Sequence, residues 1–121
     1  MNRKTDDSSN ACEALIRVLE KAARIGASSI ELEYEDHEWF VYYFVENTGV
    51  GARDIPRELQ QAVIEELVKR AGLSRKPKGK MQVNLLGKDH EVVVKERDVF
   101  GESVFNLTLK EQQKNNDPRQ G

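Results

Sequence analysis

The first pattern along the chain is a set of apolar residues at helical spacing, which begins at Cys12. They recur at intervals of three and four positions, which places them on one face of a helix: Cys12, Leu15, Ile16, Leu19, Ala22 and Ala23. Asn10 is suited to cap this helix, because Glu13 stands where its side chain reaches back to the cap. Gly26 is suited to end it, since glycine adopts the positive φ found just past a helix end.

The next segment alternates between apolar and acidic residues. Its order is Ile30, Glu31, Leu32, Glu33, Tyr34 and Glu35. Alternation of this kind predicts a strand with one buried face and one solvated acidic face. Carboxylates two residues apart on a strand are about 7 Å apart, so the row is too splayed to hold one metal ion without further ligands.

A second strand, from His37 to Val45, has apolar residues on both faces. One face carries Phe40, Tyr42 and Phe44, and the other carries Trp39, Val41, Tyr43 and Val45. Helices on one side of a sheet cover only one of these faces. The aromatic surface, defined as Phe40, Tyr42 and Phe44, is therefore either core beneath a helix or a surface that binds a protein partner.

The second half of the chain predicts one helix and three strands. After a loop over residues 47–52, Asp54 and Pro56 are suited to start the helix and Gly72 to end it. A basic connector over residues 73–80 follows, and alternating apolar residues then predict strands at about 81–85, 90–95 and 104–109. The fold class is α+β, with two helices packed on a mostly antiparallel sheet of about five strands, in the order helix, two strands, helix, three strands.

The apolar faces of these elements predict a single core. Its members are Leu15, Leu19, Ile30, Leu32, Val41, Leu59, Val63, Leu67, Val83, Val92, Phe105 and Leu107. Residues 1–9 and 110–121 are polar and have nothing to bury, so we expect two disordered tails around one domain over residues 10–109.

Composition narrows the function classes. The formal net charge of −2 gives no global attraction to nucleic acid or to an anionic membrane. No segment approaches the about 20 apolar residues of a membrane span, and the start of the chain lacks the apolar region of a signal peptide. We therefore expect a cytoplasmic protein that does not insert into a membrane.

No pattern predicts a catalytic site. The chain lacks the Gly-x-x-x-x-Gly-Lys-Ser/Thr phosphate loop. The two histidines, His37 and His90, have no spacing suited to zinc and are expected to be solvated. Ser28 and Ser29 have no histidine nearby in sequence to act as a base. We expect no enzymatic activity, no cofactor and no metal.

One run of positive charge stands out. Six basic residues fall within twelve positions with no acid among them: Lys69, Arg70, Arg75, Lys76, Lys78 and Lys80. This density suits an anionic ligand or nucleic acid. The alternative is a solvated connector after a helix whose C-terminus favours cations.

Short motifs spread along the chain resemble one family. They are Gly26-Ala27-Ser28 followed by Ile30, a helix start at Pro56 closing with Ala71-Gly72-Leu73, and Gly101-Glu102-Ser103-Val104. In this register the chain is similar to the PAS-like N-terminal domain that precedes the motor core of type II secretion and type IV pilus assembly ATPases. The resemblance runs from about Leu15 to Leu109 and implies a stand-alone, degenerate copy without the P-loop core.

The departures from the family fall where it contacts nucleotide. The resemblance implies arginines in the second and last strands, and the matching positions here are Tyr42, Phe44 and Leu107. None of these side chains replaces a guanidinium, with its permanent charge and forked donors. The resemblance therefore implies a scaffold that is kept and a nucleotide contact that is lost.

These observations favour a non-catalytic protein-interaction module in a bacterial cytoplasm. It would dock on another secretion-type component, or on a second copy of itself, through the aromatic surface. The alternative is a binder of nucleic acid or of an anionic ligand through residues 69–80. A third possibility is a PAS-like sensor of a small molecule, which requires an internal cavity.

Overall fold

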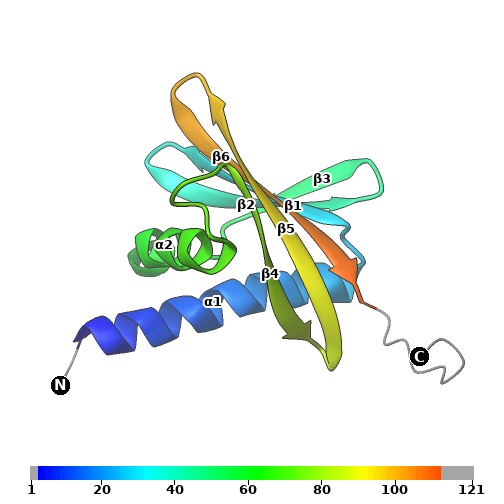
Figure 1. The fold of residues 1–121 in the computed structure, drawn as a ribbon. Coiled ribbons are helices and arrows are strands. Elements are labelled where there is room, and N and C mark those ends of the chain that lie inside the picture. Colours follow the sequence, from blue (N-terminus) through cyan, green and yellow to red (C-terminus); the bar gives the residue numbers. More distant parts are fainter. Residues whose placement is uncertain (1–2, 113–121) are drawn as a thin grey trace, which may run out of the picture.

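The structure is a computed structural model that describes residues 3–112 of the 121-residue chain. Its elements are α1 (Arg3–Ile25), β1 (Ser29–Glu35), β2 (Glu38–Val45), β3 (Thr48–Ala52), the 3-10 turn η1 (Arg57–Leu59), α2 (Gln60–Ala71), β4 (Lys78–Leu85), β5 (Lys88–Val99) and β6 (Glu102–Glu111). Both α-helices lie on the same side of one sheet (Figure 1). The predicted α+β class with two helices is confirmed.

The sheet has six strands in the order β3-β2-β1-β6-β5-β4, and every neighbouring pair is antiparallel. The first three strands and the last three are each built from hairpins. The two halves meet where β1 pairs with β6, with Ser29 opposite Thr108. The central pairing therefore joins residues that are far apart in the sequence.

The sixth strand, β3, corrects the prediction of about five strands. Residues 47–52 were expected as a loop because Gly49 and Gly51 disfavour strands. In the structure these glycines pair with Phe44 and Tyr42 of β2. A Cβ added to Gly49 would lie 2.7 Å from the Phe44 ring, and one added to Gly51 would lie 2.8 Å from the Tyr42 ring. The two rings cover the bare backbone of β3 and complete the strand.

The ends of the fold also differ from the expected boundaries. α1 begins at Arg3, before the expected cap at Asn10, because neither glycine nor proline interrupts residues 3–9. β6 reaches Glu111, so Lys110 and Glu111 belong to a strand and not to a tail. The remainder of the two expected tails, residues 1–2 and 113–121, lies outside the described residues.

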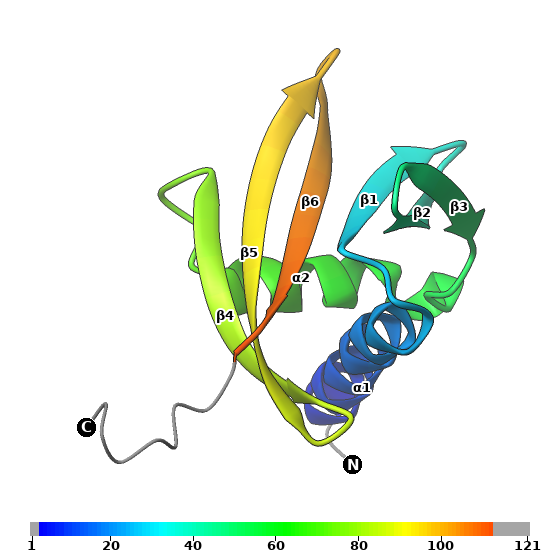
Figure 2. The ribbon, with the colours of Figure 1, turned by 90° about the vertical axis from the view of Figure 1, so that its right-hand side faces the viewer.

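The core fills the space between the helices and one face of the sheet. Every predicted core residue is buried except Leu59, which is half-buried and packs against the core. In β4, exposed and buried residues alternate strictly along the strand. The sheet therefore has a covered face and an open face. Figure 2 looks onto the open face, with α2 passing behind β5 and β6.

The connector between α2 and β4 is shorter than expected, because β4 already begins at Lys78. Gly79 lies inside this strand, buried against the end of α2. A Cβ on Gly79 would be 1.7 Å from the Ala71 carbonyl oxygen, so only glycine allows the strand and the helix end to approach so closely. Neither helix in residues 3–112 combines the length and the apolar character of a membrane span.

Candidate functional site

The aromatic surface lies on the open face of the sheet. Phe40 and Tyr42 stand opposite Glu33 and Glu31 of β1. They alternate along β2 with the buried Val41 and Tyr43, which places them on the face away from the core. All three rings of the aromatic surface are half-buried, and none belongs to the core or packs against it. The interpretation that these rings are core beneath a helix is therefore wrong. The other face of β2 supplies the core, through Val41 and Tyr43.

Neighbouring side chains hold the aromatic surface in place. The Tyr42 hydroxyl donates a hydrogen bond of 2.8 Å to Glu35. This bond and, to a lesser extent, burial raise the pKa of Tyr42. The guanidinium of Arg53 lies 5.3 Å from the centre of the Phe40 ring, within cation–π range. The rings are thus ordered on a strand and not free on a loop.

An acidic row on β1 borders the aromatic surface. It consists of Glu31, Glu33 and Glu35, as the alternation predicts. Burial raises the pKa of Glu33, and the charges of Glu31 and Glu35 add to this effect, while Arg97 opposes it. Arg97 of β5 forms an ion pair of 2.7 Å with Glu31. The row is a negative strip near the middle of the open face.

The structure places the six basic residues of segment 69–80 in two separate groups. Lys69 and Arg70 lie in the last turn of α2, where the negative end of the helix dipole stabilises their positive charge. Arg70 pairs with Glu66 at 2.7 Å, so much of its charge is already compensated. Arg75 is exposed on the connector. These three residues do not line a common hollow with the rest of the segment.

The other three basic residues lie close to two lysines from the neighbouring strands β5 and β6. Together they line a hollow of about 590 Å³ on the β4, β5 and β6 part of the open face, here called the basic hollow: Lys76, Lys78, Lys80, Lys95 and Lys110. Lys95 stands directly opposite Lys78 in the β4–β5 pairing. Glu91 is the one acidic residue of the lining, and it lies 3.7 Å from the Lys80 ammonium group.

Sequence reasoning missed Lys95 and Lys110. Each lies well beyond the basic run at residues 69–80, and no local motif marks it. Only the antiparallel register brings Lys95 opposite Lys78 and Lys110 opposite Glu91. Alternation along the predicted strand at 90–95 could have placed Lys95 on the open face, but not beside residues 76–80. Lys110 was expected in the C-terminal tail, and only the longer β6 of the structure brings it to this face.

The three positions where the family has arginine do not converge. Leu107 is fully buried on the covered face, whereas Tyr42 and Phe44 point to the open face. Arginines at these three positions would therefore lie on both sides of the sheet. They would form no single phosphate site within this chain.

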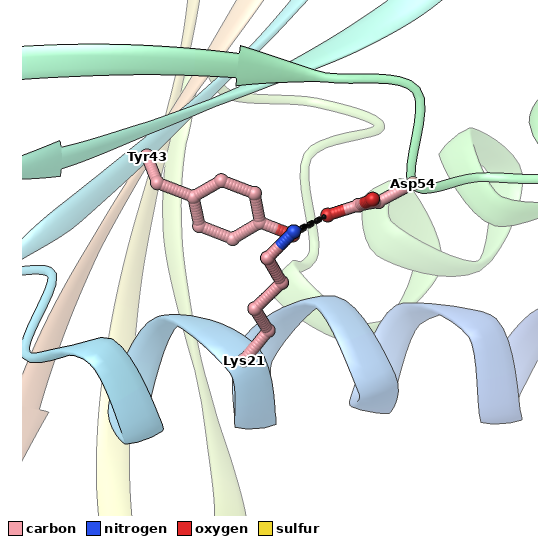
Figure 3. A network of polar contacts seen from close by, with 3 residues as sticks. All are labelled: Lys21, Tyr43 and Asp54. Atoms are coloured by element: carbon pink, nitrogen blue, oxygen red, sulfur yellow. Dashed lines mark hydrogen bonds and ion pairs between the residues drawn. The ribbon is translucent and has the colours of Figure 1, made fainter.

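A polar network ties the covered face together (Figure 3). Asp54, which was expected to cap the second helix, accepts hydrogen bonds from Lys21 of α1 at 2.6 Å and from the Tyr43 hydroxyl at 2.7 Å. Burial raises the pKa of Tyr43, and the bond to Asp54 adds to this. Burial also acts to raise the pKa of Asp54, but its bonds from Lys21 and Tyr43 outweigh that and lower it. All three groups are satisfied within the network, which makes it a structural tie.

No arrangement for metal chemistry occurs within residues 3–112, where no three or more His, Cys, Asp or Glu side chains are grouped to hold an ion. His90, expected to be solvated, is buried instead, with its Nδ1 2.9 Å from the Lys88 carbonyl oxygen.

In comparisons with known proteins, no family model matches this chain, and neither does any curated protein. The resemblance to the secretion ATPase domain therefore stays a prediction.

Proposed function

We propose that this domain is a non-catalytic protein-interaction module that docks its partner on the aromatic surface. One observation carries the proposal. Phe40, Tyr42 and Phe44 stand in a row on the open face, where they are half-buried, and none of them packs against the core beneath the helices of residues 3–112. Tyrosine and phenylalanine are enriched at protein interfaces, and contiguous exposed apolar groups mark such interfaces.

The order of these rings supports docking of a folded partner. Glu35 fixes the Tyr42 hydroxyl, and Arg53 lies over Phe40. A surface that is ordered before binding loses little conformational entropy when the partner arrives. Arg53 adds a guanidinium at the rim, and arginine is also enriched at interfaces.

The partner we propose is a component of a secretion or pilus machine, or a second copy of this chain. The first rests on the motifs that resemble the N-terminal domain of the secretion ATPases. Tyr42 and Phe44 occupy positions where that family has arginine, so the aromatic surface replaces a nucleotide contact by an apolar one. The second rests on the uncovered aromatic strand, which two copies can cover for each other.

A matched pair of variants tests the proposal. Tyr42→Lys removes the central ring and places an ammonium group beside Glu31 and Glu35. Because the ring also covers Gly51 of β3, circular dichroism and thermal unfolding of the variant check that the fold is retained. Phe100→Lys makes the same kind of change at a fully exposed aromatic residue outside the aromatic surface. Self-association is measured by sedimentation velocity, and binding to a purified secretion or pilus ATPase motor core by calorimetry.

We expect Tyr42→Lys to raise the dissociation constant by about tenfold or more, since central aromatic residues dominate interface energies. Phe100→Lys should leave it unchanged. The proposal fails if neither a second copy nor the motor core binds the wild-type chain. It also fails if Phe100→Lys weakens binding as much as Tyr42→Lys.

A further inference from the structure

The basic hollow is a second surface, which docking on the aromatic surface does not use. We propose that it binds a compact phosphate compound that carries several negative charges. Its lining comes from β4, β5, β6, the connector before β4 and Ala71 at the end of α2, whereas the aromatic surface belongs to β2. The two proposals therefore rest on different residues and can fail separately.

The charge of the lining selects an anion. Five lysines and a single glutamate surround the hollow, in a chain whose formal net charge is −2. Glu91 lies within ion-pair distance of Lys80 alone among the lysines. Lysine is a flexible point charge with three donors, which suits phosphate oxygens spread over several directions.

The pair of Lys78 and Lys95 is unfavourable for the fold. The two lysines are direct cross-strand partners, and like charges in that position destabilise a sheet. Places where a sequence departs from such a local rule are expected at functional sites. A bound polyanion would turn this repulsion into attraction, which gives the pair a role that folding alone does not.

The borders of the hollow favour a compact ligand over a long nucleic acid. A volume of about 590 Å³ lies within the range of small-molecule sites. Beyond β6, the next strand across the open face is β1 with its acidic row. Arg97 of β5, which reaches that row, is already paired with Glu31. A strand of nucleic acid extending across the sheet would meet these carboxylates, whereas a ligand confined to the basic hollow would meet Glu91 alone, which already lies near Lys80.

The lining also offers room for an uncharged part of the ligand. Val93 and Thr108 are cross-strand partners within the hollow, and both are half-buried. Their methyl groups provide an apolar contact between the surrounding ammonium groups. The inferred ligand class is thus a small molecule with a polyphosphate or several phosphate groups, with or without an attached apolar or sugar group.

Calorimetry with inorganic tripolyphosphate tests the inference on the full chain. We expect saturable one-to-one binding that weakens steeply between about 0.05 M and about 0.5 M salt. Lys95→Gln should raise the dissociation constant about tenfold, as the loss of one charge-assisted hydrogen bond would. Lys88→Gln is the matched control, because Lys88 is also exposed but lies outside the hollow and pairs with Glu111.

Thermal unfolding separates a ligand site from a structural one. Lys95→Gln should keep or raise the melting temperature while weakening tripolyphosphate binding, and Lys110→Gln repeats the test should the first variant misfold. Tyr42→Lys should leave this binding unchanged. The inference is overturned if tripolyphosphate binding does not saturate, or if Lys88→Gln and Lys95→Gln lose equal affinity for tripolyphosphate. Tighter binding of a single-stranded oligonucleotide, with amide shifts that reach Glu31, would also overturn it, in favour of nucleic acid.

Discussion

Asp54 joins three elements through one carboxylate. It follows β3 in the chain and accepts hydrogen bonds from α1 and β2, where a helix cap was expected from the sequence. The Lys21 ammonium group also lies 4.9 Å from the centre of the Tyr43 ring. An aspartate two residues before a proline is a helix-start signal, and nothing in the local sequence distinguishes a cap from a partner of distant side chains.

We predict that Asp54→Ala lowers the free energy of unfolding at pH 7 by about 1–2 kcal/mol, because it leaves the hydroxyl of the buried Tyr43 without its acceptor. Denaturant titration measures the loss. Tyr43→Phe provides the double-mutant cycle, and the combined variant should lose less than the sum of the two single losses. Additive losses would show that the two groups do not interact.

The same carboxylate predicts a pH dependence. The pKa of Asp54 is lowered in the folded state, so its contribution is present above the ordinary value of about 4 and is lost as pH falls below it. The pKa of Tyr43 is raised, so stability should also fall as pH rises above about 10. The difference in unfolding free energy between wild type and Asp54→Ala should therefore shrink from pH 7 to pH 3. A constant difference would contradict the network.

Most strands and both helices could be predicted from apolar periodicity, because one face of each packs on the core. β3 could not, since its glycines carry no side chain whose pattern reveals a buried face. What stabilises β3 is two rings of the neighbouring strand, and that contact appears only once the β2–β3 register is known. The early start of α1 at Arg3 was missed for a related reason, as polar residues show no stripe.

Gly79 provides a test of how α2 and β4 are joined. Gly79→Ala should destabilise the protein by about 2 kcal/mol or more, because its Cβ would overlap the Ala71 carbonyl oxygen and neither backbone can move freely. Lys78→Ala, one residue away and exposed, should change stability by no more than about 0.5 kcal/mol. Thermal and denaturant unfolding of both variants gives the comparison, and equal stabilities would show that the junction is looser than described.

The open face divides into three zones that follow the strand order. The aromatic surface lies on β2, the acidic row on β1, and the basic hollow on β4, β5 and β6. The sequence shows the first two as local patterns. The third combines residues 76–80 with Lys95 and Lys110, which become neighbours only in the folded sheet. The basic hollow could therefore not be predicted from the sequence alone. In the proposed scheme, the acidic row would keep an anion on the basic side and leave the aromatic surface to a protein.

Amide-shift mapping on the isotope-labelled full chain is the most direct test of this division. With rising protein concentration or added motor core, we predict shifts confined to β2, β3 and the adjoining acidic row. With tripolyphosphate, the shifts should be confined to β4, β5, β6 and the connector before β4. Shifts that centre on α1 and α2 in the first titration, with β2 unaffected, would contradict the account that this domain works through the open face of its sheet.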